Sequence, residues 1–369
     1  MTVSGITPRQ LEELRLWAEK ADLASGAAWQ AGASRGLLSA AVPVECGGSG
    51  LGYEAACLAF EAVAEAAGTG GLPFAMSAHL WAFQTPLAEF GNPEQHAAYL
   101  GRAISGDLIG AFAGTEPDAG SDLLSLRTHA TRDAAGQWRL TGQKTFVTNG
   151  PIADVFLVLA RTDGGSAITS LTAFLVPKNA PGLTIGAEIP KGALTGAHFN
   201  SVRLDDCAVP NSSLLGGVGG GFAVLMHAMR HERAFILAPA LGLMSKSLRD
   251  AIRHVTVRTQ FGHPLGTYDP IRERVVRMHL SLTSAREALL TTARLADGDR
   301  LDHGRASLTK LHVSTEFNNF CGELPDLYGG YAVLPDTEVL GLISDAVASR
   351  SYSGTSDMQI KVIAEELGL

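Results

Sequence analysis

The chain changes its hydrophobic period twice, and this change constrains its fold more than any other feature. Apolar residues are spaced by three or four in residues 9–21 and 53–67, as on one face of an α-helix. From about residue 110 the pattern is replaced by short β-rich runs bounded by Gly, Pro, Asp and Asn, such as DVFLVLART and LTAFLVP. After NSSLLGGVGGG the helical spacing returns. Because helices and strands do not alternate, a doubly wound α/β sheet is disfavoured.

We therefore expect an α+β fold, mainly α, with three parts. Residues 1–109 are predicted to form an N-terminal helical domain, residues 110–212 a central β-barrel or sandwich, and residues 213–369 a C-terminal helical domain. No repeat and no low-complexity tail interrupts this order.

Three segments allow finer predictions. GQWRLTGQKTFVTNG predicts two strands that meet at Thr141-Gly142. The long apolar stretch that starts at Phe222 predicts one helix, bent at Pro239. A further helix is expected to begin at Asp269, with proline in its first turn.

Composition argues against several classes of protein. The 369 residues carry 29 Lys and Arg against 37 Asp and Glu, a formal net charge of -8, which disfavours a nucleic-acid binder. The four cysteines are far apart and have no histidine cluster nearby, so we expect reduced thiols and no metal site. The first 21 residues do not resemble a secretory signal, and no window of about 18 uninterrupted apolar residues occurs. We expect a cytoplasmic protein with no membrane span.

Common catalytic and nucleotide-binding motifs do not occur. The glycine-rich runs GGSGLGY and GGVGGGF fit neither a dinucleotide fingerprint nor a P-loop, and G-x-S-x-G and H-E-x-x-H are both missing. GTEPDAGSD, residues 114–122, is more informative, because its hydroxyls and backbone N–H groups suit a polar cofactor edge or a phosphate. A surface turn built on its aspartates is the alternative.

A family resemblance covers nearly the whole chain. AFAGTEPDAGSDLLSLRTHA followed by LTGQKTFVTNGPIADVFLVLA resembles the flavin-contacting signature of the acyl-CoA dehydrogenase family. VECGGSG, VRLDDCAVPNSSLLG, RTQFGHPLGTYDPIRERVVRMHL, DLYGGYAVLP and SYSGTSDMQIKVIAEELGL match further motifs in the same order. The resemblance implies a C-terminal four-helix bundle, a homodimer or homotetramer, and FAD bound between the β domain and this bundle.

The resemblance also implies which residues contact FAD. Phe112, Gly114, Thr115 and Ser121 would border the flavin and pyrophosphate, Phe146 and Thr148 would flank the isoalloxazine, and Arg258, Gln260 and Phe261 would reach the FAD of a neighbouring subunit. Gly329 and Gly330 would let the backbone approach the diphosphate, and Thr355 would close over the adenine-linked part, whereas Asp326 and Asp357 stand where the family commonly has amides.

The catalytic base is not at its most common position. Many members place Glu immediately before a Gly-Thr pair, and here that residue is Ser353, whose hydroxyl is no base on its own. Other members hold the base on a helix, directly before an arginine, as in Glu232-Arg233. Glu232 also falls on a stripe of apolar residues spaced by three or four: Leu225, Met229, Ile236, Ala240 and Leu243. We expect Glu232 to be the base; a buried ion pair with Arg233 or another arginine is the alternative.

A substrate pocket would surround this base. Its candidate residues are His79, Met229, Arg233, Tyr352, Ser353 and Gly354, although a core position is the alternative for His79. The resemblance implies that the α-proton of an acyl thioester is removed by a carboxylate while the β-hydrogen leaves as hydride to flavin N5. The acyl group would be carried on CoA or an acyl carrier protein, in fatty acid metabolism or polyketide biosynthesis. Electrons would pass to an electron-transfer flavoprotein or another acceptor. A flavin monooxygenase and a catalytically silent flavin-binding protein remain as alternatives.

Overall fold

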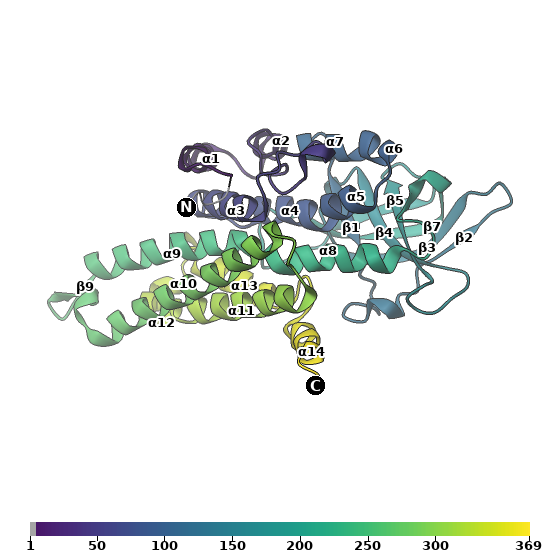
Figure 1. Ribbon diagram of the computed structural model, residues 1–369. Coiled ribbons are helices and arrows are strands. Elements are labelled where there is room, and N and C mark those ends of the chain that lie inside the picture. Colours follow the sequence, from purple (N-terminus) through teal and green to yellow (C-terminus); the bar gives the residue numbers. More distant parts are fainter. Residues whose placement is uncertain (1–4) are drawn as a thin grey trace.

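The structure contains the predicted helical, β-rich and second helical regions, in the predicted order. The structure, a computed structural model, describes residues 5–369 apart from the side chain of Asp336, so residues 1–4 of the predicted N-terminal domain lie outside the description. Helices form the N-terminal part, strands the middle and helices the remainder (Figure 1). The predicted α+β class is confirmed.

The N-terminal part is a cluster of short helices around α3. α1 begins with a capping box, in which the Thr7 hydroxyl accepts from the Gln10 N–H at 3.3 Å and the Gln10 side chain accepts from the Thr7 N–H at 2.8 Å. The helices are α1 (Pro8–Lys20), α2 (Gly26–Ser34), α3 (Tyr53–Ala67), α4 (Gly71–Ala78), α5 (Thr85–Phe90), α6 (Pro93–Gln95) and α7 (Gly101–Ser105), with a π-helical segment, His79–Gln84, between α4 and α5.

The strands form one mixed, mostly antiparallel sheet. They are β1 (Gly110–Ala113), β2 (His129–Arg132), β3 (Trp138–Thr148), β4 (Val155–Thr162), β5 (Leu171–Pro177), β6 (Leu183–Glu188), β7 (Phe199–Val209) and β8 (Leu214–Leu215). Their order is β6-β7-β3-β2-β4-β5-β8, and β1 pairs in parallel with β4. The predicted break at Thr141-Gly142 is wrong: β3 runs through it, and the turn-like residues coincide with a register shift against β7.

Both faces of the central strands are buried. Alternate residues of β4 point to opposite sides, as the twofold period of a strand requires. Val155, Leu157 and Leu159 join the core shared with the helices, whereas Phe156, Val158 and Ala160 join a second core inside the β domain. The sheet is thus anchored to the helical parts on one side and packs on its own residues on the other.

The C-terminal part is a helical bundle. Its helices are α8 (Gly221–Phe235), α9 (Ala238–Val257), α10 (Asp269–Asp297), α11 (His303–Gly322), α12 (Leu324–Tyr328), α13 (Val339–Ser349) and α14 (Ser356–Glu366), and the short hairpin β9 (Thr259–Gln260) and β10 (His263–Pro264) joins α9 to α10. α9, α10 and α11 lie side by side, and α8 extends toward the sheet (Figure 1). α10 begins at Asp269 as predicted.

The predicted single helix from Phe222 is in fact two helices. α8 ends at Phe235 and α9 begins at Ala238, so the chain breaks just before Pro239 rather than bending at it. Proline has no N–H and its ring collides with the carbonyl four residues earlier, here that of Phe235. The same residue fits the first turn of a new helix, where no intrahelical donor is needed.

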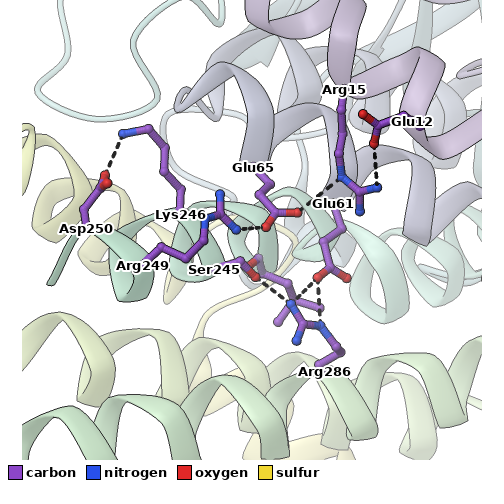
Figure 2. Close-up of polar contacts among 10 residues, drawn as sticks. Glu12, Arg15, Glu61, Glu65, Ser245, Lys246, Arg249, Asp250 and Arg286 are labelled. Atoms are coloured by element: carbon purple, nitrogen blue, oxygen red, sulfur yellow. Dashed lines mark hydrogen bonds and ion pairs between the residues drawn. The ribbon is translucent and has the colours of Figure 1, made fainter. Parts of the chain in front are cut away.

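Ion pairs fasten the N-terminal helices to the bundle (Figure 2). Arg286 of α10 pairs with Glu61 of α3 through Nε at 2.7 Å, and it also donates to Ser245 of α9 at 2.5 Å. One turn further along α3, Glu65 pairs with Arg249 of α9. These contacts set the position of α3 against α9 and α10. No helix of the described residues is both long and apolar enough to cross a membrane.

Candidate active site

Glu232 lies in the last turn of α8, on the apolar stripe seen in the sequence. Its helical neighbours Met229 and Ile236 are buried, while Glu232 itself is half-buried. Burial raises the pKa of Glu232 to about 7, and the Ser353 hydroxyl and the charges of Lys310 and Arg233 oppose this rise. The Ser353 hydroxyl lies close enough to act on Glu232, but its geometry falls short of a full hydrogen bond and Ser353 Oγ has no partner.

No counter-ion neutralises Glu232 at contact distance. Among the described residues, Glu54, Glu61 and Glu116 each form an ion pair within 4.0 Å and Glu232 forms none. Arg233, the predicted alternative partner, is half-buried, and its Nε and Nη1 have no hydrogen-bond partner. An unpaired carboxylate with a raised pKa can accept a proton near neutral pH. The geometry therefore favours the base over the structural ion pair.

The turn between α13 and α14 faces Glu232 and has a constrained backbone. Ser353 has φ 56° and Gly354 has φ 91°, both in the left-handed region. Gln359 of α14 donates to the Ser353 and Gly354 carbonyls at 3.2 and 2.9 Å. An ideal Cβ on Gly354 would approach Gln359 Nε2 at 2.7 Å, so a larger residue would displace the Gln359 amide in addition to straining the backbone. A serine held at positive φ is typical of a functional site.

Lys310 is a residue of this site that the sequence reasoning missed. It lies on α11, is 1% exposed, and donates from Nζ to the Ser349 carbonyl at 2.6 Å. Its ammonium lies 4.9 Å from the centroid of the Tyr352 ring, and burial lowers the pKa of Lys310 to about 7. The sequence did contain a signal: Ala306 and Val313, four residues before and three after, are buried on the same face, as for Glu232 on α8.

Of the remaining predicted pocket residues, Met229 and Tyr352 lie near Glu232 and Lys310, whereas His79 does not. Met229 and Tyr352 lie beside Glu232 and Lys310 respectively, and burial raises the pKa of Tyr352. His79 lies elsewhere, fully buried, with Nδ1 2.9 Å from the Gly110 amide nitrogen and its ring stacked near Phe83. Burial lowers the pKa of His79 to about 4. This placement favours a core role for His79 over a place in the acyl pocket.

Part of the predicted cofactor set is gathered where the loop after β1 meets β3. Lys144 of β3 donates to the Gly114 carbonyl at 3.1 Å, and the Thr145 N–H donates to the Thr115 carbonyl at 2.9 Å. These bonds bring the loop after β1 next to Phe146. The Phe146 side chain is 67% exposed and its φ is 52°.

These residues fit a planar ring system. A bulky residue at positive φ is strained, and here the strain presents an aromatic face outward. An ideal Cβ on Gly114 would lie 2.7 Å from the Phe112 ring, so a larger residue here would force that ring to move. Thr148 is half-buried two residues along β3, and Ser121 is exposed beyond the loop.

A second part of the cofactor set lies at the opposite end of the molecule. Arg258 directly precedes the β9–β10 hairpin and Gln260 and Phe261 belong to it, far from the sheet in Figure 1. The Arg258 guanidinium lies 5.1 Å from the Tyr331 ring, so the neighbouring Gly329-Gly330 segment belongs to this end as well. A cavity of about 620 Å³ opens here, lined in part by Arg253, His254, Val257, Arg258, Tyr328 and Tyr331.

Three further residues of the predicted cofactor set lie in or near the last helices, and two of them have structural partners of their own. Asp326 pairs with Arg274 at 2.8 Å. Thr355 caps α14 by accepting from the Met358 N–H at 3.3 Å, and Asp357 is exposed in the first turn of that helix. Within residues 5–369 no group of three or more His, Cys, Asp and Glu side chains is arranged to hold a metal ion.

Known family models match the chain from end to end. Residues 3–107 match the acyl-CoA dehydrogenase N-terminal domain, residues 111–207 its middle domain and residues 219–368 its C-terminal domain. The chain belongs to the acyl-CoA dehydrogenase family. The resemblance inferred from the motifs is thereby confirmed.

Some relatives of this chain are named for carrier-bound substrates. An L-prolyl-(peptidyl-carrier protein) dehydrogenase from Pseudomonas fluorescens is 34% identical over 92% of this chain and 90% of its own length. Among solved structures, the prolyl acyl carrier protein oxidase AnaB superposes with a TM-score of 0.94 at 34% identity, covering 99% of this chain and 100% of that one. PigA with FAD and proline superposes with a TM-score of 0.93 at 30% identity, covering 99% of both chains.

Proposed function

We propose that this chain is an FAD-dependent dehydrogenase that desaturates an acyl thioester, with Glu232 as the base. The observation that carries the proposal is the state of Glu232: it is half-buried, forms no ion pair within 4.0 Å in the described residues, and has a pKa of about 7. Such a group exchanges a proton readily at neutral pH. Its place next to the Ser353-Gly354 turn suits a substrate held between α8 and that turn.

The residues of this chain supply the proton transfer and the positioning. Glu232 takes the α-proton, which the neighbouring thioester carbonyl makes acidic. FAD, when bound, supplies the acceptor for the β-hydride. Arg233 has two N–H groups without partners, and Ser353 has a free hydroxyl, so each can donate to an oxygen of the substrate.

We further propose that the complete FAD site needs two copies of the chain. Phe112, Gly114, Thr115, Ser121, Phe146 and Thr148 would hold the flavin side, and Arg258, Gln260, Phe261, Gly329 and Gly330 of a second copy would reach the phosphates and adenosine. Support comes from the distance between the two sets along the molecule. Phe261, in the β9–β10 hairpin, is 92% exposed and so is accessible to a second copy.

For the substrate, we propose a carrier-protein thioester, with a prolyl group as the leading candidate. The support is similarity alone: two relatives, from Pseudomonas fluorescens and a Serratia strain, are named as L-prolyl-(peptidyl-carrier protein) dehydrogenases and are 34% and 32% identical. A CoA thioester is the alternative, because an acyl-CoA dehydrogenase from Bacillus subtilis is 33% identical. Transfer of the electrons to an electron-transfer flavoprotein belongs to the same proposal.

Anaerobic titration of the FAD-loaded protein tests the function. The panel contains L-prolyl-carrier protein, L-prolyl-CoA and butyryl-CoA, and Glu232→Gln serves as the matched control. We expect loss of the flavin's visible absorption with one thioester and the loss of two hydrogens from that acyl group by mass spectrometry. An unchanged flavin with every thioester would contradict a dehydrogenase, and an oxygen-dependent hydroxylated product would indicate a monooxygenase.

A further inference from the structure

Lys310 is a buried cation that the proposed chemistry does not yet use. Its side chain is 1% exposed, and among the described residues it forms no ion pair within 4.0 Å. Burial of a lysine without a contacting carboxylate is costly, so such a residue needs a compensating role. Lys144, the other fully buried lysine of the described core, has such a carboxylate in Glu116 at 2.8 Å.

The contacts of Lys310 all lead to the turn before α14. Nζ donates to the Ser349 carbonyl at 2.6 Å, where α13 ends, and the ammonium lies 4.9 Å from the Tyr352 ring centroid. Gln359 holds the other end of the turn through the Ser353 and Gly354 carbonyls. The strained part of the turn, Ser353-Gly354, is therefore fixed from two sides: by the charged donor Lys310 and by the neutral donor Gln359.

The charges around Lys310 come from three elements. On α8, which packs against α11, Glu232 and Arg233 carry the charges that act on Lys310; the Tyr352 ring centroid lies 4.9 Å from its ammonium, and Asp345 of α13 acts on Tyr352. On α11 itself, the charges that act on His303 are those of Arg230, Arg233 and Asp302. Glu232 is the one acidic group of this set that acts directly on Lys310, and the Lys310 charge in turn lowers the pKa of Glu232.

We propose that Lys310 is a positioning residue for the base: it fixes the turn through the Ser349 carbonyl and acts as a counter-charge for Glu232 on the adjacent helix α8. The proposal rests on the proposed function, since it gives Lys310 a part in the proton transfer assigned to Glu232. A lysine that only satisfied a carbonyl could be replaced by any neutral donor without changing the protonation of Glu232. The charge and the hydrogen bond can therefore be separated by experiment.

Four FAD-loaded variants make this separation. Lys310→Met removes both charge and hydrogen bond, Lys310→Gln removes the charge and keeps a donor, Lys310→Arg keeps both, and Gln359→Met loosens the same turn without changing charge. The first readout is the pH profile of flavin reduction by the substrate. The second is an infrared titration of carboxyl groups, with Glu232→Gln used to assign the band of Glu232, which needs no turnover.

We expect the acid limb of the profile and the Glu232 titration to move up by about one pH unit in Lys310→Met and Lys310→Gln. Lys310→Arg should restore both, and Gln359→Met should lower the rate at every pH without moving the limb. The proposal would be overturned if Lys310→Gln and Gln359→Met both showed the same acid limb and the same Glu232 titration as the parent protein. If no thioester reduces the parent flavin, the proposed function fails, and the infrared titration alone decides whether Lys310 acts on Glu232. If Lys310→Met does not fold, Lys310→Gln decides.

Discussion

Two glutamate–lysine sets are buried in this molecule, and they are in opposite states. In the β domain, Glu116 accepts from Lys144 Nζ at 2.8 Å and from the Arg127 and Thr128 N–H groups at 2.6 and 3.0 Å. Burial alone would raise the pKa of Glu116, but Lys144 and these donors outweigh it and hold the pKa below its usual value. Between α8 and α11, Glu232 and Lys310 make no such contact, and each has a pKa of about 7.

The difference shows that burial and residue type do not decide what a carboxylate does. Glu116 is charged and satisfied, and it fastens the loop after β1 to β3. Glu232 is only half-buried, yet it keeps its proton-accepting capacity, because no cation among the described residues lies within 4.0 Å of it. A satisfied ion pair stabilises a loop, whereas an unsatisfied carboxylate is available for chemistry.

Glu232→Gln tests the reactive side of this comparison and carries the largest expected effect. The amide keeps the size of the side chain and cannot accept the proton, so flavin reduction should fall about 10²–10⁴-fold. FAD content and the melting temperature should stay within the range of the parent protein. Stopped-flow reduction under anaerobic conditions measures the rate, and near-normal reduction would remove Glu232 as the base.

Lys144→Met tests the structural side. Removal of one partner leaves Glu116 buried and unpaired, and we expect a loss of about 3–5 kcal/mol in the free energy of unfolding. Thermal and urea unfolding of the FAD-loaded protein measure it. The double variant Lys144→Met with Glu116→Gln should recover part of the loss. Lys310→Met should cost less, because no contacting carboxylate is left behind; an equal loss would break the contrast.

Arg286→Met extends the comparison to a partly exposed pair. Arg286 is 34% exposed and pairs with Glu61, whose pKa is raised by burial despite that partner. We expect a loss of about 1–2 kcal/mol in the free energy of unfolding, reduced by solvent screening. Arg249→Met is the control, since Arg249 is 58% exposed and its pair with Glu65 should contribute less than about 1 kcal/mol. Equal losses in the two variants would count against the role of burial.

The pH dependence of the reaction sharpens the comparison. A base with a pKa of about 7 is active when unprotonated, so the rate of flavin reduction should be lost as the pH falls through 7. The expected slope is about tenfold per pH unit below the pKa. A rate that stayed constant down to pH 5 would indicate a base with an ordinary carboxyl pKa.

Much of the site could be predicted because its signals are local. The spacing of Leu225, Met229 and Ile236 identified a helix face, and Glu232 on that face was identified as exceptional without any knowledge of its surroundings. The same test applied to α11 would have found Lys310 between Ala306 and Val313. Two predictions failed for local reasons: turn-forming residues at Thr141-Gly142 are accommodated by a bulge within β3, and Pro239 starts a helix instead of bending one.

The sequence by itself determined the order of helices and strands, the family and the candidate base, because hydrophobic period and motif spacing are properties of neighbouring residues. Only the tertiary structure decided that Lys310 and Glu232 lie on two helices that pack together without forming an ion pair, that Gln359 and Lys310 hold the turn at Ser353, and that the predicted FAD contacts lie at two ends of the molecule. These facts depend on how α8, α11 and α14 pack. The charge state of a buried group follows from distances of a few ångströms between elements that are far apart in sequence, and no local pattern encodes those distances.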